Sequence, residues 1–252
     1  MTATMVGFVG LLGLIVGSFL NVVVHRVPRH ESIVSPGSRC PGCGTPVSPL
    51  DNVPVLSWLV LRGRCRHCHE PISARYPLLE LLTAAVFATV AAVRGVDADL
   101  IRVLPFAAAL VALAAIDLEH RVLPNRIVVP LAVFGVAAGA LLATPKLPEL
   151  LIAGAGAFAA LLVVALIQPR GMGMGDVKLA GAAGLFLGLS VVPALLLAFF
   201  TGSVVGLGLM AVEGAAARKR AIPFGPFLAL GSLLALLVGP ELIDLYSQTL
   251  LD

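Results

Sequence analysis

Long runs of apolar residues, separated by short segments that hold most of the charges, constrain this fold more than any other feature. A transmembrane helix needs about 20 mostly apolar residues to cross about 30 Å of hydrocarbon. Six runs of suitable length lie at 4–24, 77–94, 98–116, 127–143, 149–168 and 224–243. A further run over 177–213 is too long for one crossing and is expected to break near Gly188, Ser190 and Pro193, which leaves helices at 177–188 and 191–213. The pattern predicts an all-α polytopic membrane protein with about eight transmembrane helices.

Composition excludes the other classes of chain. Of the 252 residues, 59% are hydrophobic and 12% are charged, whereas soluble chains have roughly 45–50% apolar and about 25% charged residues. The polar content is too low for disorder, and no fixed period indicates collagen or a coiled coil. A net charge of +3 would suggest nucleic acid in a soluble domain, but in a membrane protein it reflects orientation. We therefore expect no nucleic-acid partner.

The basic residues predict how the chain is oriented. No Lys or Arg precedes Arg26 and no small-residue cleavage site follows the first apolar run, so this run is expected to be an uncleaved helix and not a signal peptide. With its basic flank in the cytoplasm, only Arg94, Arg102 and Lys146 of the 17 basic residues lie outside. Both termini are then outside, and the run Arg218-Lys219-Arg220 is interpreted as a determinant of topology.

All four cysteines lie in the one sizeable polar loop, residues 26–76, as Cys40-Pro-Gly-Cys43 and Cys65-Arg-His-Cys68. Two CxxC pairs at this separation are typical of a tetrahedral zinc site, because both sulfurs of each pair can reach one ion. Two disulfides or a redox pair are the alternatives, and both fit poorly with a loop predicted to lie in the reducing cytosol. A closed shell of four thiolates makes the predicted zinc structural.

Two aspartates are expected at the cytoplasmic ends of predicted spans. Asp117 ends the third, and Asp176 follows the loop Gly171-Met-Gly-Met-Gly175 at the start of the sixth. Ionisable groups at membrane depth are costly and are candidates for function. Such a pair can form a dyad in which one carboxylate activates water and the other donates a proton to a carbonyl. The alternative is that each is a helix cap or an interfacial charge.

Further candidates surround this pair. Gly173 and Gly175 would let an extended substrate backbone approach Asp176. Lys178 lies two residues beyond Asp176, so it cannot share the face of Asp176 if the helix has already begun. It is interpreted either as a contact to substrate or lipid phosphate or as a plain interfacial lysine. Glu80, one turn inside the second span, is expected to pair with a basic group or to recognise substrate. The segment around Gly225 is predicted to line a cavity, because two prolines interrupt it.

Several blocks, in order along most of the chain, resemble the type IV prepilin leader peptidase family. The matching blocks are Gly17-Ser-Phe-Leu-Asn-Val-Val-Val-His-Arg26, both CxxC pairs, Asp51-Asn-Val-Pro-Val-Leu-Ser-Trp58, Arg75-Tyr-Pro-Leu-Leu-Glu-Leu-Leu82, Asp117 with Leu123-Pro-Asn125, Gly173-Met-Gly-Asp-Val-Lys-Leu179 and Ile222-Pro-Phe-Gly-Pro-Phe227. One departure is Asn125, where many members carry an acidic residue. Another is that no glycine-rich Rossmann motif for a methyl donor is visible.

The resemblance implies an intramembrane aspartyl endopeptidase of the GxGD type, with Asp117 and Asp176 at the positions of the catalytic aspartates. Such enzymes cut the leader from prepilin or pseudopilin substrates after a Gly, at the cytoplasmic face of the bacterial inner membrane. Full-length members also methylate the new N-terminus with S-adenosylmethionine, and the cysteine loop that accompanies this activity is present. The expected organisation is a first helix (1–25), a zinc-binding loop (26–76) and a membrane-embedded peptidase domain (77–252).

Two other functional classes are compatible with the same residues. A noncatalytic membrane scaffold could use the zinc loop to dock a pilus or secretion assembly. A proton-coupled transporter could use Asp117, Glu80 and Asp176 as a relay, but it would need a continuous water path, and two of these acids are predicted to lie at one face.

Overall fold

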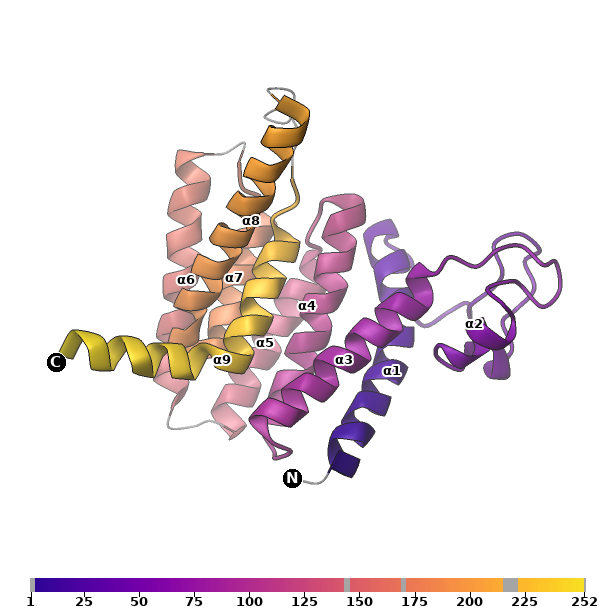
Figure 1. Ribbon diagram of the computed structural model, residues 1–252, viewed down its shortest axis with the longest axis horizontal. Helices are drawn as coiled ribbons and strands as arrows, with labels where there is room; N and C mark the ends of the chain where they lie inside the picture. Colours follow the sequence, from indigo (N-terminus) through magenta and orange to yellow (C-terminus); the bar gives the residue numbers. More distant parts are fainter. Residues whose placement is uncertain (1–2, 143–145, 169–170, 215–221, 252) are drawn as a thin grey trace. The chain divides into compact units, whose positions relative to one another are not determined.

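The structure is a computed structural model that describes residues 3–142, 146–168, 171–214 and 222–251. Within these ranges its regular elements are helices (Figure 1), and the only β pairing is two isolated bridges, Arg39 with Pro46 and Arg64 with Pro71. This confirms the predicted all-α class. The chain forms two compact units, Met1–Asp97 and Ala98–Asp252. The three-part functional division suggested by the sequence stays a prediction.

The first unit is built on two long helices, α1 (Ala3–Arg26) and α3 (Arg75–Arg94). Glycines let these helices touch, because a Cβ at Gly13 would lie 2.7 Å from Ala84 Cα and one at Gly17 would lie 2.7 Å from Glu80 Cα. Between the helices runs the polar loop, which contains 3₁₀ turns at Val27–Arg29 and Pro49–Asn52 and the short helix α2 (Leu56–Val60).

The second unit contains the remaining helices, which are joined by short connections. They are α4 (Leu100–His120), α5 (Asn125–Leu142), α6 (Leu147–Ile167), α7 (Met174–Leu187), α8 (Val191–Glu213) and α9 (Gly225–Leu251). Helix α7 packs against α4, α5, α6 and α9, and most of its residues are buried. A Cβ at Gly184 would lie 2.6 Å from Gly154 Cα, so glycines set the approach of α7 to α6.

Each predicted apolar run forms a helix, and the break predicted within 177–213 is a 3₁₀ turn at Gly188–Ser190. Gly188 begins this turn at a φ of 57°, in the region that glycine adopts most easily. In the part of the chain that the structure describes, six helical segments are long and apolar enough to cross a membrane, with α7 and α8 counted together as Met174–Glu213. The apolar part of α9, Gly225–Gly239, is shorter. The chain is a membrane protein, while eight crossings stay a prediction and the run 218–220 lies outside the described residues.

Candidate active site and metal centre

Asp117 lies in the last turn of α4, and its carboxyl group is held from the start of α9. The helix ends because Arg121 adopts a left-handed conformation and donates its backbone N–H to the Asp117 carbonyl at 2.9 Å. The Asp117 side chain is buried, and its Oδ2 accepts a 2.9 Å hydrogen bond from the backbone N–H of Gly225. Two segments 108 residues apart in sequence therefore meet at one carboxylate oxygen.

Gly225 leaves no space for a side chain at this contact. A Cβ there would lie 2.7 Å from Asp117 Oδ2 and 3.1 Å from Leu123 Cδ2. The sequence singled out Gly225 as part of an irregular segment, but it gave no sign that the partner of this glycine is Asp117. The structure places it directly against the aspartate.

Asp176 lies in the first turn of α7, where Gly173 precedes the helix with an extended backbone. Its Oδ2 accepts a 3.1 Å hydrogen bond from the Gly173 N–H, and its own N–H donates to the Gly173 carbonyl at 3.1 Å. The carboxyl group therefore caps the positive end of α7. Asp176 is nevertheless buried, so the group lies inside the helix bundle.

The surroundings of the two aspartates meet at one side chain, that of Leu123. A Cβ at Gly175, the residue before Asp176, would lie 2.8 Å from Leu123 Cβ. The Leu123 side chain also packs at Gly225, whose N–H donates to Asp117. The sequence analysis named Leu123 only as part of a motif and did not predict that it lies between the two aspartates. The available signal was its position, six residues after Asp117.

Lys178 reaches a different partner. Its Nζ donates a 3.1 Å hydrogen bond to Asn125 Oδ1, which connects α7 to the first residue of α5. A side chain two positions along a helix points to another side, so Lys178 turns away from the face that carries Asp176. The amide of Asn125 supplies the acceptor oxygen at the position where an acidic residue was expected.

Glu80 lies in the first unit, on α3. The side chain is buried, and its Oε2 accepts a 2.7 Å hydrogen bond from the backbone N–H of Val55. Val55 has a φ of 60°, which is rare for a β-branched residue, and it immediately precedes α2. The bond therefore fastens α2 to α3, and substrate recognition by Glu80 stays a prediction.

The four cysteines come together as the spacing predicts. The Sγ atoms of Cys40, Cys43, Cys65 and Cys68 all lie within 4.8 Å of one another, and Cys40 Sγ is 3.6 Å from Cys68 Sγ. Tetrahedral zinc with Zn–S bonds of about 2.3 Å separates its sulfurs by about 3.8 Å. All four are free thiols, so the arrangement fits one zinc ion and not two disulfides.

The two cysteine turns have the same backbone pattern. In each, the first cysteine N–H donates to the carbonyl five residues later, and the residue four positions after that cysteine donates back to its carbonyl. The returning residue is Gly44 in one turn and His69 in the other, both at positive φ. The side chain and backbone of Thr45 hydrogen-bond to Cys43 and lower the pKa of its thiol to about 6, which favours the thiolate that zinc needs.

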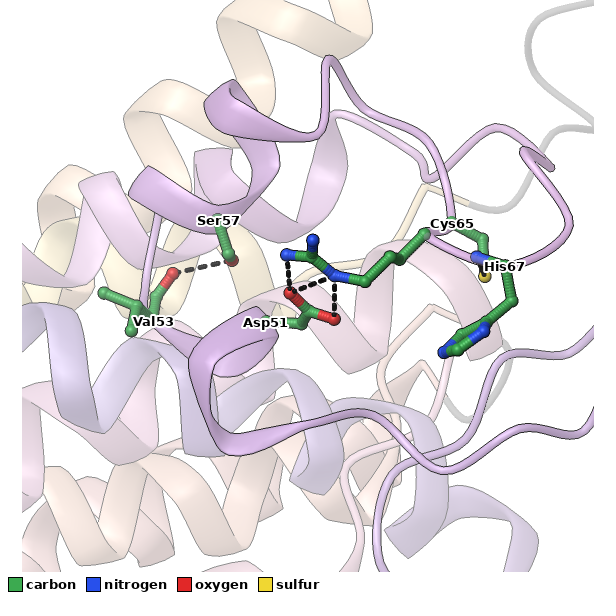
Figure 2. Close-up of polar contacts among 6 residues, drawn as sticks. Asp51, Val53, Ser57, Cys65 and His67 are labelled. Atoms are coloured by element: carbon green, nitrogen blue, oxygen red, sulfur yellow. Dashed lines mark hydrogen bonds and ion pairs between the residues drawn. The ribbon is translucent and has the colours of Figure 1, made fainter.

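Arg66 ties the second cysteine turn to the rest of the loop by an ion pair with Asp51, and Figure 2 shows Asp51 together with Val53 and Ser57 of this loop. Its Nη2 donates to Asp51 Oδ1 at 2.6 Å and its Nε donates to Oδ2 at 3.0 Å, and these bonds hold the pKa of Asp51 below its usual value. The segment from Asp51 to Ser57 leads into α2. Within it, the Ser57 hydroxyl donates to the Val53 carbonyl at 2.7 Å. Trp58 Nε1 donates to the Ile72 carbonyl at 3.0 Å. The cysteine cluster is thus connected, through α2 and Glu80, to α3.

Comparison with known proteins covers both units. Residues 104–211 match the model of the type IV leader peptidase family, and residues 11–93 match the bacterial peptidase A24 N-terminal domain. A protein named prepilin leader peptidase/N-methyltransferase from Aeromonas hydrophila is 38% identical over 269 residues, which cover 94% of this chain and 91% of the relative.

Relatives with the same name occur in other bacteria. The protein of Bacillus subtilis (strain 168) is 35% identical over 245 residues, covering 96% of this chain and 98% of its own length. That of Myxococcus xanthus (strain DK1622) is 40% identical over 218 residues, covering 84% of this chain and 65% of its own. No solved structure gives a significant match.

Proposed function

The chain belongs to the type IV leader peptidase family and is a membrane protease, and from this premise we propose that it cleaves the leader from type IV prepilin-like proteins. The cut follows a glycine, just before the hydrophobic segment of the mature protein. The observation that carries the proposal is the pair of buried carboxyl groups, Asp117 on α4 and Asp176 on α7, joined through Leu123 and held by the N–H groups of Gly225 and Gly173.

The proposed mechanism is that of an aspartyl protease. One carboxylate of the dyad takes a proton from a water molecule, and the water oxygen attacks the scissile carbonyl carbon while the other carboxyl donates a proton to the carbonyl oxygen. Collapse of the tetrahedral intermediate breaks the C–N bond, and the amine leaves with a proton from the dyad. Both hydrogen bonds from backbone N–H groups reach Oδ2 atoms, so neither bond occupies the Oδ1 atom of its carboxyl group.

Glycines around the dyad bring a substrate backbone within reach. Gly173 and Gly175 precede Asp176 and expose the backbone at the start of α7, where an extended peptide can lie. Gly225 holds Asp117 and packs against Leu123. We assign these three glycines to substrate binding and support of the dyad, and Lys178 to support through its bond to Asn125.

Zinc, when bound, would be held by Cys40, Cys43, Cys65 and Cys68 and would stabilise the loop of the first unit. Four thiolates complete the tetrahedral shell and leave no position for a reacting water. The ion therefore organises the loop, and through Arg66 and Asp51 the segment that contains α2, and takes no part in hydrolysis.

We also propose that the chain methylates the N-terminus released by cleavage, with S-adenosylmethionine as the methyl donor. The support is the shared name of the relatives, prepilin leader peptidase/N-methyltransferase, together with the cysteine loop. The described residues contain no strand followed by a glycine-rich loop and a helix, the unit that holds a nucleotide in Rossmann folds. We assign no residue to the methyl donor.

The proposed location is the bacterial inner membrane, with both termini outside and the dyad facing the cytoplasm. This orientation follows from the distribution of basic residues, which gather on the side where Asp117 and Asp176 lie. A leader that begins in the cytoplasm then reaches the dyad without crossing the membrane.

Mass spectrometry of a prepilin incubated with the purified protein in lipid nanodiscs tests this function. We expect one cut after the leader glycine, and a mass increase of one methyl group on the mature product only when S-adenosylmethionine is added. A prepilin whose leader glycine is replaced by leucine is the matched control and should stay intact. Cleavage of both substrates alike would contradict the proposed specificity.

A further inference from the structure

An open groove of about 340 Å³ lies on the second unit between α5 and α6, with α7 as its floor. Every residue that lines it is apolar except Lys178, which lies toward the N-terminal end of α7. The walls and floor include Val129 and Val133 of α5, Ala155 and Phe158 of α6, and Gly181 and Leu185 of α7.

The groove exists because α5 and α6 each pack on α7, and small residues of α7 leave space between them. A Cβ at Gly181 would lie 3.0 Å from Phe158 Cβ, so a larger residue at this position would fill the space. The outer wall residues Val129 and Val133 are half or more exposed on the surface of the unit. In a chain that spans a membrane, this groove opens to lipid.

The dimensions fit an extended aliphatic chain. The floor from Lys178 to Leu185 is about 10 Å long at 1.5 Å per residue.

Positive charge gathers at one end of the groove. Lys178 lines the groove, and its Nζ lies 3.1 Å from Asn125 Oδ1 at the first turn of α5. Arg126, the next residue, is exposed and lies three and seven positions before Val129 and Val133, so it shares their face of α5. No acidic side chain lines the groove. This end is where α5 and α7 both begin, and the ends of helices that cross a membrane lie near the lipid headgroups.

We infer that the groove is a binding site for an anionic phospholipid. One acyl chain lies along α7 between α5 and α6, and the phosphate group lies between Lys178 and Arg126. Basic pockets between transmembrane helices bind anionic headgroups in this way. The inference requires only that the chain is embedded in a membrane, so it stands or falls separately from the proposed proteolysis.

Lipid at this site would hold together the two helices whose first turns flank the dyad. The Lys178–Asn125 bond already connects α5 to α7 two residues after Asp176. A phosphate on Lys178 and Arg126 adds a second connection, so we expect bound anionic lipid to raise the temperature at which the protein unfolds.

Native mass spectrometry of the purified full chain in detergent tests the site, with phosphatidylglycerol and phosphatidylcholine of identical acyl chains as probes. We expect one tightly retained phosphatidylglycerol. In the double variant Lys178→Gln, Arg126→Gln its affinity should fall roughly 30-fold, because two cations near anionic headgroups together contribute about 2 kcal/mol to binding. Lys146→Gln, at the far end of α6, is the matched control and should retain the lipid.

A second pair of variants tests the groove itself. Ala155→Leu fills it from the exposed side of α6 and should abolish retention, whereas Ala159→Leu, exposed on the same helix outside the groove, should not. Thermal unfolding of each variant without added lipid shows whether the fold is intact. Equal retention of both lipids, or retention unchanged in Ala155→Leu, would overturn the inference.

Discussion

At the scale of single residues, each aspartate of the dyad is oriented by a backbone N–H group. Gly225 donates to Asp117 and Gly173 donates to Asp176, in both cases to Oδ2. A backbone donor fixes the direction of a carboxyl group without adding a positive charge beside it. The arrangement thus orients both groups for a reaction in which protons move between them, water and substrate.

Replacing Gly225 by alanine should damage the site without unfolding the protein. The new Cβ would meet Asp117 Oδ2 at 2.7 Å, so the carboxyl group must move, and misplacement of about 1 Å can lower a rate about 100-fold. We expect kcat for prepilin cleavage to fall by about that factor. Gly156→Ala, where nothing lies within 4 Å of the new Cβ, should behave as wild type; equal rates in the two variants would contradict this role of Gly225.

The cysteine cluster gives a second prediction at this scale. Cys68→Ser should remove a ligand, so that zinc measured by plasma emission falls from one ion per chain to well below one. Thr45→Val keeps all four ligands but loses the hydroxyl beside Cys43. It should still bind zinc, with an affinity about 10-fold lower, as for other residues that support a ligand. Full zinc content in Cys68→Ser would refute the four-thiolate site.

At the scale of helices, the site depends on how α4 and α7 are fixed at the ends away from the dyad. Arg102, buried on α4, donates from Nη1 to the carbonyl of Phe186 at 2.6 Å, and from Nε to Asp99 Oδ1 at 2.7 Å. The Phe186 carbonyl belongs to the last turn of α7, where a carbonyl lacks an intrahelical partner. The guanidinium therefore caps α7 from α4, next to the stacked rings of Phe106 and Phe186.

Arg102→Met should loosen this pair of helices. The Phe186 carbonyl would lose its buried charged donor, a loss of about 1–3 kcal/mol, and we expect a clearly lower unfolding temperature in circular dichroism. Ile101→Met, at a neighbouring position that is 64% exposed, is the matched control and should unfold like wild type. Identical melting of the two variants would mean that Arg102 does not join α4 to α7.

The helices could be predicted from sequence, but the contacts between them could not. Long apolar runs and the turn residues around Gly188 are local signals, so the elements of the second unit and the break between α7 and α8 were predicted. Helix α2 has only five residues, and Val55, which precedes it, has a positive φ and donates its N–H to Glu80 on another helix. The bonds from Gly225 to Asp117 and from Arg102 to Phe186 join residues 108 and 84 positions apart, and distant partners leave no pattern in the chain.

The candidate site could be predicted only in part, because some of its features leave local signals in the sequence and others depend on contacts between distant residues. Asp117 and Asp176 were candidates for a dyad because acidic residues at membrane depth are costly, and the family resemblance implied that they pair. The CxxC spacing indicates one shared ion without knowledge of the fold. Which glycine holds which aspartate depends on packing. So does the position of Leu123 between Gly175 and Gly225.

At the scale of the whole molecule, the orientation in the membrane decides which substrates can reach the dyad. We expect a protease site inserted at 96–98, between α3 and α4, to be cut in intact spheroplasts, and one inserted at 32–36 to be cut only in inverted vesicles. Both segments are exposed, so accessibility depends on the side of the membrane alone. Cutting at 32–36 in intact spheroplasts would contradict the predicted cytoplasmic face.

The central claim is that Asp117 and Asp176 hydrolyse the leader peptide bond together. The most direct measurement is the mass of a prepilin after incubation with wild type, Asp117→Asn or Asp176→Asn in the same nanodiscs, with Glu241→Gln, at an exposed position of α9, as a control. Both dyad variants keep the side-chain shape and an acceptor for the Gly225 or Gly173 N–H. We predict cleavage by wild type and by the control, and an intact prepilin with either dyad variant whose melting matches wild type. Normal cleavage by either folded dyad variant would contradict the account.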